Sequence, residues 1–235
     1  MGLTVYYDLD LPGDQPESRA RELVVELRAA AVALGAERVT AVRRILRSDC
    51  EGLGGEELDL EWLVRCFAER GIEDPRNPER FLTVLPELGY GFGAEIGRCE
   101  PVILGLARHP ATVADAGVEV PTCLTGWSWR ACTKTQYASL VSLSHFVESH
   151  RRLIALLDAA QSLGLAVGVR DDSGYWEHRD ERQLLDALAH WNALVARIAG
   201  RVADGFDASA GEGPGPKLEA PIFRDPHFEH LEAEE

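Results

Sequence analysis

The sequence has few of the features that mark secreted, membrane or disulfide-rich proteins. Its five cysteines form an odd set without a Cys-x-x-Cys pair, which favours reduced thiols and excludes a zinc ribbon. No apolar run reaches the roughly 18 residues that a membrane span needs. The N-terminal residues lack a basic segment followed by a leucine-rich stretch, the pattern of a secretory signal. We therefore expect a cytoplasmic protein that does not enter a membrane.

Positive charge is also scarce, because 24 lysines and arginines stand against 39 aspartates and glutamates, giving a net charge of −15. Nucleic-acid backbones are bound by concentrated positive charge, so bulk nucleic-acid binding is disfavoured. Only two of the cations are lysines, Lys134 and Lys217. A lysine that persists in an arginine-rich sequence can mark a place that needs a compact ammonium able to lose its proton.

The familiar catalytic motifs are missing. There is no Gly-Lys-Ser/Thr phosphate loop and no Gly-x-Ser-x-Gly elbow, and Gly89-Tyr90-Gly91-Phe92-Gly93 lacks the context of a dinucleotide fingerprint. His145 and His150 are five residues apart, which places them about 140° apart on a helix rather than on one zinc-binding face. The sequence therefore predicts no metal site and no cofactor, and names no reaction.

Hydrophobic periodicity predicts an α+β fold in a single domain, with an N-terminal β-α-β unit, a mixed sheet and two long C-terminal helices. Alternation from Leu3 to Leu9 is typical of a strand with one buried face. A helix to Leu34 and a strand over Val39–Leu46 follow, and a right-handed crossover would make the two strands parallel. The remaining prediction is a helix near Glu56–Arg70, strands at 81–85, 102–106, 127–133 and 165–169, and helices over Ala138–Leu163 and Asp180–Asp204.

Three regions are predicted along the chain. Residues 1–205 form the globular domain, and residues 206–217 are a linker rich in glycine and proline. Residues 218–235 form an acidic tail in which large apolar residues such as Phe223 and Phe228 recur. This tail is either a docking peptide or a disordered end.

The densest set of candidate site residues lies where the strand over 127–133 is followed by a helix. Such a junction leaves backbone N–H groups free and favours anions, so Lys134 there could hold a phosphate or carboxylate. Alternatively a threonine simply caps the helix and Lys134 is solvated. The candidate catalytic residues are Lys134, Tyr137, His109 and Asp172, and the candidate ligand-binding residues are Trp127, Trp129, Arg130, Thr135, Gln136 and Trp176.

Some blocks of the sequence resemble a bacterial protein family. They are Gly2-Leu3-Thr4, Thr133-Lys134-Thr135-Gln136-Tyr137-Ala138, Tyr175-Trp176-Glu177 and Trp191-Asn192. The resemblance spans roughly residues 2–200. That family has no assigned activity, so the resemblance implies no catalytic residue.

Three functions are compatible with these observations. The first is a cytoplasmic binding or regulatory module that recognises a small anionic ligand or a partner protein. The second is an enzyme, a transferase or hydrolase, in which nearby tryptophans lower the pKa of Lys134 and Tyr137 acts as an acid. The third is a structural subunit that docks through its last helix or tail. The sequence leaves the oligomeric state open.

Overall fold

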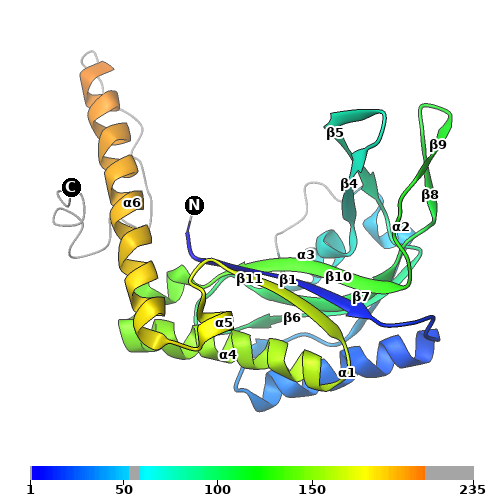
Figure 1. The fold of residues 1–235 in the computed structure, drawn as a ribbon, viewed down its shortest axis with the longest axis horizontal. Helices are drawn as coiled ribbons and strands as arrows, with labels where there is room; N and C mark the ends of the chain where they lie inside the picture. Colours follow the sequence, from blue (N-terminus) through cyan, green and yellow to red (C-terminus); the bar gives the residue numbers. More distant parts are fainter. Residues whose placement is uncertain (1, 53–58, 210–235) are drawn as a thin grey trace.

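A seven-stranded antiparallel sheet forms the centre of the computed structural model, which describes residues 2–52 and 59–209, with side chains up to residue 195 (Figure 1). The strand order is β11-β1-β10-β7-β6-β2, and β3 also pairs with β6. Every pairing among these strands is antiparallel. The strands are β1 (Thr4–Leu11), β2 (Arg38–Val39), β3 (Arg43–Leu46), β6 (Leu88–Glu95), β7 (Val102–Arg108), β10 (Trp127–Lys134) and β11 (Ala166–Asp171).

The predicted alternation in the first strand corresponds to one buried and one exposed face of β1. Leu3, Val5, Tyr7 and Leu9 are fully buried, whereas Tyr6 and Asp10 on the opposite face are exposed. Helices α1 (Glu17–Ala33) and α4 (Leu143–Ser162) lie side by side under this buried face (Figure 1). Leu23 and Leu27 of α1 and Leu153 and Leu157 of α4 contribute to the same core.

The α+β class is confirmed, but the sheet is antiparallel rather than mixed. The order strand, helix, strand is present at the start of the chain, as β1, α1 and β2. However, β10, β7 and β6 separate β1 from β2, so these two strands run in the same direction without being neighbours. The physical reason is that hydrophobic alternation identifies a strand's buried face but not its partner. Here, strands from the C-terminal half occupy both sides of β1.

Strands β6 and β7 are buried on both faces because α1 covers one face and α3 (Leu60–Ala68) the other. The alternating glycines of β6 face α3. A Cβ atom at Gly91 would lie 2.9 Å from Val64, and one at Gly93 would lie 3.1 Å from Leu60. The glycine run that fails as a nucleotide motif therefore lets a helix approach the sheet closely.

Two hairpins rise from the sheet on the side away from α1 and α4 (Figure 1). Strands β4 (Arg70–Asp74) and β5 (Asn77–Val84) form the first, and β8 (Thr112–Asp115) and β9 (Val118–Pro121) the second. Arg70 thus begins a strand instead of ending the predicted helix. A short helix α2 (Arg47–Cys50) precedes α3, and the chain between them lies outside the described residues.

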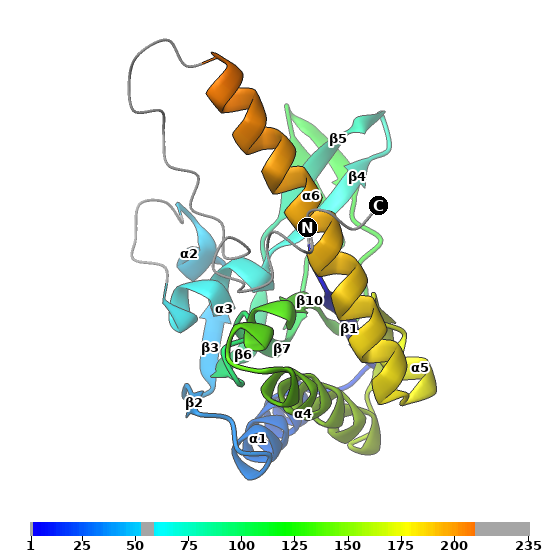
Figure 2. The ribbon, with the colours of Figure 1, turned by 90° about the vertical axis from the view of Figure 1, so that its left-hand side faces the viewer.

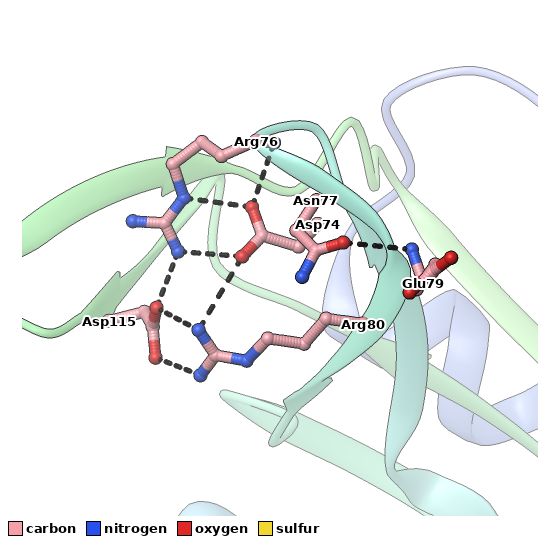
Figure 3. Close-up of polar contacts among 6 residues, drawn as sticks. All are labelled: Asp74, Arg76, Asn77, Glu79, Arg80 and Asp115. Carbon is pink, nitrogen blue, oxygen red and sulfur yellow. Dashed lines mark hydrogen bonds and ion pairs between the residues drawn. The ribbon is translucent and has the colours of Figure 1, made fainter.

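An ionic clasp of Asp74, Arg76, Arg80 and Asp115 joins the two hairpins (Figure 3). Arg76 donates two hydrogen bonds to Asp74, both of 2.8 Å, and also contacts Asp115. Arg80 binds the two oxygens of Asp115 at 2.9 and 2.6 Å. The hydrogen bonds from the side chain and backbone of Arg76 lower the pKa of Asp74 to about 2.

Both long helices at the C-terminal end begin later than predicted, and the last one extends farther. A 3-10 helix, η1 (Gln136–Leu140), replaces the first turns of the predicted helix, and α4 starts after Ser142, whose hydroxyl accepts a hydrogen bond from His145 N–H. After the single turn α5 (Tyr175–His178), α6 (Glu181–Ser209) rises on the same side of the sheet as the hairpins (Figure 2).

Helix α6 passes the predicted domain boundary at residue 205 by four residues. The rest of the predicted linker and the whole predicted tail lie outside the described residues. Among the residues that the structure describes, no helix is long and apolar enough to cross a membrane.

Candidate functional site

Lys134 lies at the end of β10 and is held by an ion pair. Its Nζ atom is 3.2 Å from Oε1 of Glu100, and its backbone N–H donates to Oε2 of the same carboxylate at 3.2 Å. The side-chain hydrogen bond to Glu100 raises the pKa of Lys134 above its ordinary value. This is the opposite of the direction expected for a general base, so the ammonium stays charged near neutral pH.

The tryptophans expected beside Lys134 belong to the core. Trp127 and Trp129 are 2% and 1% exposed. Their indole N–H groups donate to the backbone carbonyls of Gln15 and Ile103, both at 3.0 Å. The ring of Trp129 fills the space above Gly105, where an added Cβ would come within 2.8 Å of it. These side chains therefore do not form the walls of a ligand site.

Thr135 and Gln136 make internal contacts at the predicted junction. The Thr135 hydroxyl lies 3.0 Å from Nδ1 of His150 and is fully buried. The Gln136 side chain accepts a hydrogen bond from Leu3 N–H at 3.1 Å and donates to Asn192 at 2.6 Å. Because η1 has only five residues, this junction does not provide the helix N-terminus expected to bind an anion.

His109 does not lie near the other candidate catalytic residues. Ser128 pairs with Ala107 at one end of β10, whereas Lys134 ends the strand at the other. Six residues of strand separate those ends by about 20 Å. Nε2 of His109 is 2.9 Å from the carbonyl oxygen of Ala68, and burial lowers the pKa of the imidazole.

Asp172, Tyr137 and Trp176 lie in the part of the molecule that contains Lys134. Asp172 accepts a hydrogen bond from Thr4 N–H at 3.3 Å, and Thr4 is the register partner of Lys134. The phenol of Tyr137 is half-buried and contributes to the raised pKa of Lys134. Trp176 donates its backbone N–H to Asp171. The four candidate catalytic residues thus divide between the two ends of β10.

A buried polar network that sequence reasoning missed connects η1, α4 and β11. The imidazole of His150 lies between the Thr135 hydroxyl and Asp171, with Nε2 3.1 Å from the carboxylate. Burial alone would raise the pKa of Asp171, but hydrogen bonds from His150 and Ser173 outweigh it and lower the pKa.

The order hydroxyl, imidazole, carboxylate is that of a hydrolase relay. However, Thr135 and His150 are 0% exposed, so no substrate reaches them and the network holds the three elements together. A sequence signal was available, because His150 lies four residues after Phe146 and three before Leu153, at helical spacing on the inward side of α4.

Strands β11, β1 and β10 have one face that is turned away from α1 and α4 and is accessible to solvent. We call it the open face. Helix α6 rises at one side of it and the two hairpins at the other (Figure 1). Its exposed or half-buried members are Tyr6, Asp8, Asp10, Arg130, Cys132, Lys134, Ala166, Gly168 and Arg170.

Aromatic and charged groups are paired across the open face. The guanidinium of Arg170 lies 3.9 Å from the ring centroid of Tyr6, and Arg130 forms an ion pair with Asp8 on the neighbouring strand. Among the described residues, no acidic side chain forms an ion pair with Arg170. Its charge therefore remains available to a partner.

Arg70 of β4 reaches the border of the open face, a role that its predicted place in a helix did not suggest. Its Nη2 atom is 3.5 Å from the Ser128 hydroxyl, and its Nη1 atom is buried without a hydrogen-bond partner among the described residues. Burial, and then the nearby charge of Arg130, lowers the pKa of Arg70, which Asp8 and Asp10 partly offset.

Two cavities in the described part of the chain are lined by none of the candidate site residues. One of about 270 Å³ is lined by α1. The other, of about 420 Å³, lies beside the β8–β9 hairpin and is lined by residues that include Arg47, Leu85 and Glu119. Within the described ranges, no group of three histidine, cysteine, aspartate or glutamate side chains could hold a metal ion.

Comparison of the chain with protein-family models, with curated proteins and with solved structures found no match.

Proposed function

We propose that this protein is a binding module whose open face docks a folded partner protein that presents a carboxylate to Arg170. The observation that carries the proposal is the three-strand face, left open by the described residues, on which Arg170 is stacked on Tyr6. Tyrosine and arginine are enriched among the residues that dominate protein–protein binding energies. A guanidinium that already lies in a fixed position loses little side-chain entropy when it binds a carboxylate.

The electrostatics of Lys134 favour a partner protein over a small anion as the ligand. The ammonium is already neutralised by Glu100 at 3.2 Å, so a phosphate placed there would have to displace a carboxylate. On the open face Arg130 is likewise paired with Asp8. Alternating charges of this kind suit a protein surface with a complementary pattern.

The size of the open face sets a lower limit on the area that the partner covers. An eight-residue strand such as β1 is about 26 Å long, and three strands are about 14 Å wide. The face therefore offers roughly 370 Å², about half of the 800 Å² that one partner contributes to a standard interface. We expect the partner also to contact α6 or the hairpins, which rise on the same side (Figure 1).

A charge exchange tests this proposal while keeping opposite charges at the two exchanged positions. The double variant Asp8→Arg, Arg130→Asp keeps an ion pair across β1 and β10 but reverses its direction on the open face. The matched control, Arg19→Glu with Glu22→Arg, exchanges an exposed pair on α1 that is 3.7 Å apart. Both variants preserve the net charge, and we expect both to melt close to the wild-type temperature.

Immobilised full-length proteins would be used to recover partners from an extract of the source cells. We expect one protein to be captured by the wild type and the α1 control and lost with the open-face variant. Equal recovery by all three proteins would contradict the proposal, as would loss with the α1 control alone.

A further inference from the structure

Strand β11 has a single neighbour among the residues that the structure describes. It stands at the end of the strand order and pairs with β1. The backbone hydrogen bond from Asp172 N–H to Thr4 C=O fixes which residues of this strand face β1. Because alternate residues of an antiparallel pair bond the neighbour, Val167 and Val169 direct their N–H and C=O groups away from β1.

This edge lacks the usual protection against further pairing. Sheet edges are commonly blocked by proline, by lysine or by a bulge, whereas β11 reads Ala-Val-Gly-Val-Arg-Asp and its pairing with β1 has no register shift. Its arginine is stacked on Tyr6. Its carboxylate, Asp171, is buried against His150, so the strand exposes no negative charge to an incoming strand.

The pattern of outward groups is symmetric about Gly168. In an antiparallel pairing centred there, Val167 lies opposite Val169 of the partner subunit. Both residues point their backbone groups outward, so each such pair exchanges both N–H···O=C bonds. Residues directly opposite each other share a face, so the valines meet on the side of α4. On the open face Ala166 meets Arg170 of the partner subunit, and no like charges are opposed.

We propose that two copies of this chain associate through β11 and form one continuous antiparallel sheet. The net charge of −15 is no barrier at physiological salt, because interactions between exposed charges are screened beyond about 8 Å. A two-fold axis perpendicular to the sheet places both open faces on the same side of the dimer. This inference does not depend on what the open face binds.

Sedimentation velocity of the full chain over a concentration series tests the proposal. We expect the wild type to approach twice the chain mass of 25.8 kDa. Val169→Pro removes an N–H that β1 does not use, a position where edge strands tolerate proline, so this variant should stay monomeric with an unchanged circular dichroism spectrum. Val169→Thr keeps the N–H and should dimerise. A monomeric wild type, or a folded Val169→Pro dimer, would overturn the proposal.

A second pair of variants separates dimerisation from folding. Ala166 is exposed and pairs with Asp10 within its own chain. Ala166→Lys gains an attraction to Asp10 but opposes Arg170 of the partner subunit, so the dimer dissociation constant should rise about tenfold, roughly threefold for each symmetry-related pair. Ala166→Glu should lower it by a similar factor. Equal dissociation constants for the two variants would show that Ala166 does not face Arg170 of the partner subunit, and would refute this register.

Discussion

Close packing constrains single residues in this protein, and Gly105 is an example in which the nearest neighbour is backbone. A Cβ atom there would lie 2.5 Å from the backbone oxygen of Tyr90 and 2.8 Å from the ring of Trp129. The backbone oxygen cannot move without disturbing β6, so the contact must be relieved by shifting a strand.

We therefore predict that Gly105→Ala lowers the free energy of unfolding by about 1–3 kcal/mol, the usual cost of overpacking a core. Gly71 is the matched control, because it also lies in a strand and an added Cβ there meets no atom within 4 Å. Urea denaturation of both variants gives the comparison. If Gly105→Ala were as stable as Gly71→Ala, strands β6 and β7 would not be packed as closely as the contact between Gly105 and Tyr90 indicates.

Lys134 shows how far a residue's rarity predicts its role. Its scarcity among the cations suggested an ammonium able to lose its proton, whereas the residue is half-buried and its pKa is raised. Composition could not reveal the pairing with Glu100, which lies 34 positions earlier in the chain and raises the pKa of the lysine. The tryptophans beside it in sequence turned out to pack in the core, because alternate residues of β10 face opposite sides.

At the scale of secondary-structure elements, the ionic clasp joins the two hairpins. The pKa of Asp74 is lowered from its ordinary value of 3.8 to about 2, first by its hydrogen bond from Arg76. Between these two values the unfolded chain binds a proton that the folded protein does not. The stabilisation by Asp74 is therefore complete above about pH 4 and is lost as the pH falls through about 2.

We predict that Asp74→Asn melts at a lower temperature than the wild type at pH 7, and that this difference shrinks as the pH approaches 2. Thermal unfolding followed by circular dichroism across this range measures both. Asp14→Asn, at an exposed aspartate with no ion pair in the described part of the chain, controls for the general loss of negative charge. A difference between Asp74→Asn and the wild type that is the same at pH 7 and pH 2 would contradict the clasp.

Elements with a regular hydrophobic pattern could be predicted from sequence, and those fixed by distant contacts could not. The alternation of Leu3, Val5, Tyr7 and Leu9 identified β1 and its buried face. The predicted start of α4 was wrong because neither the capping role of Ser142 nor the 3-10 turn before it interrupts the hydrophobic pattern of the sequence. The network around His150 was missed because it joins residues from three separate elements.

At the scale of the whole molecule, strand order decides which functional side chains can lie close together. Predicted neighbours such as β1 and β2 lie at separated positions of the sheet, while β10 and β11 enclose β1 and create the open face. The order also places His109 and Lys134 at opposite ends of β10. Neither consequence follows from local sequence, because strand pairing over such distances leaves no periodic signal.

The claim that the open face is the binding surface is tested most directly by the affinity of the recovered partner for single open-face variants. Tyr6 is 37% exposed and supports Arg170, whereas Val32 is 52% exposed on α1. By isothermal titration calorimetry we expect Tyr6→Ala to raise the dissociation constant at least about tenfold, as for a central interface tyrosine, and Val32→Ala to leave it unchanged. The same dissociation constant for wild type and Tyr6→Ala would contradict the account.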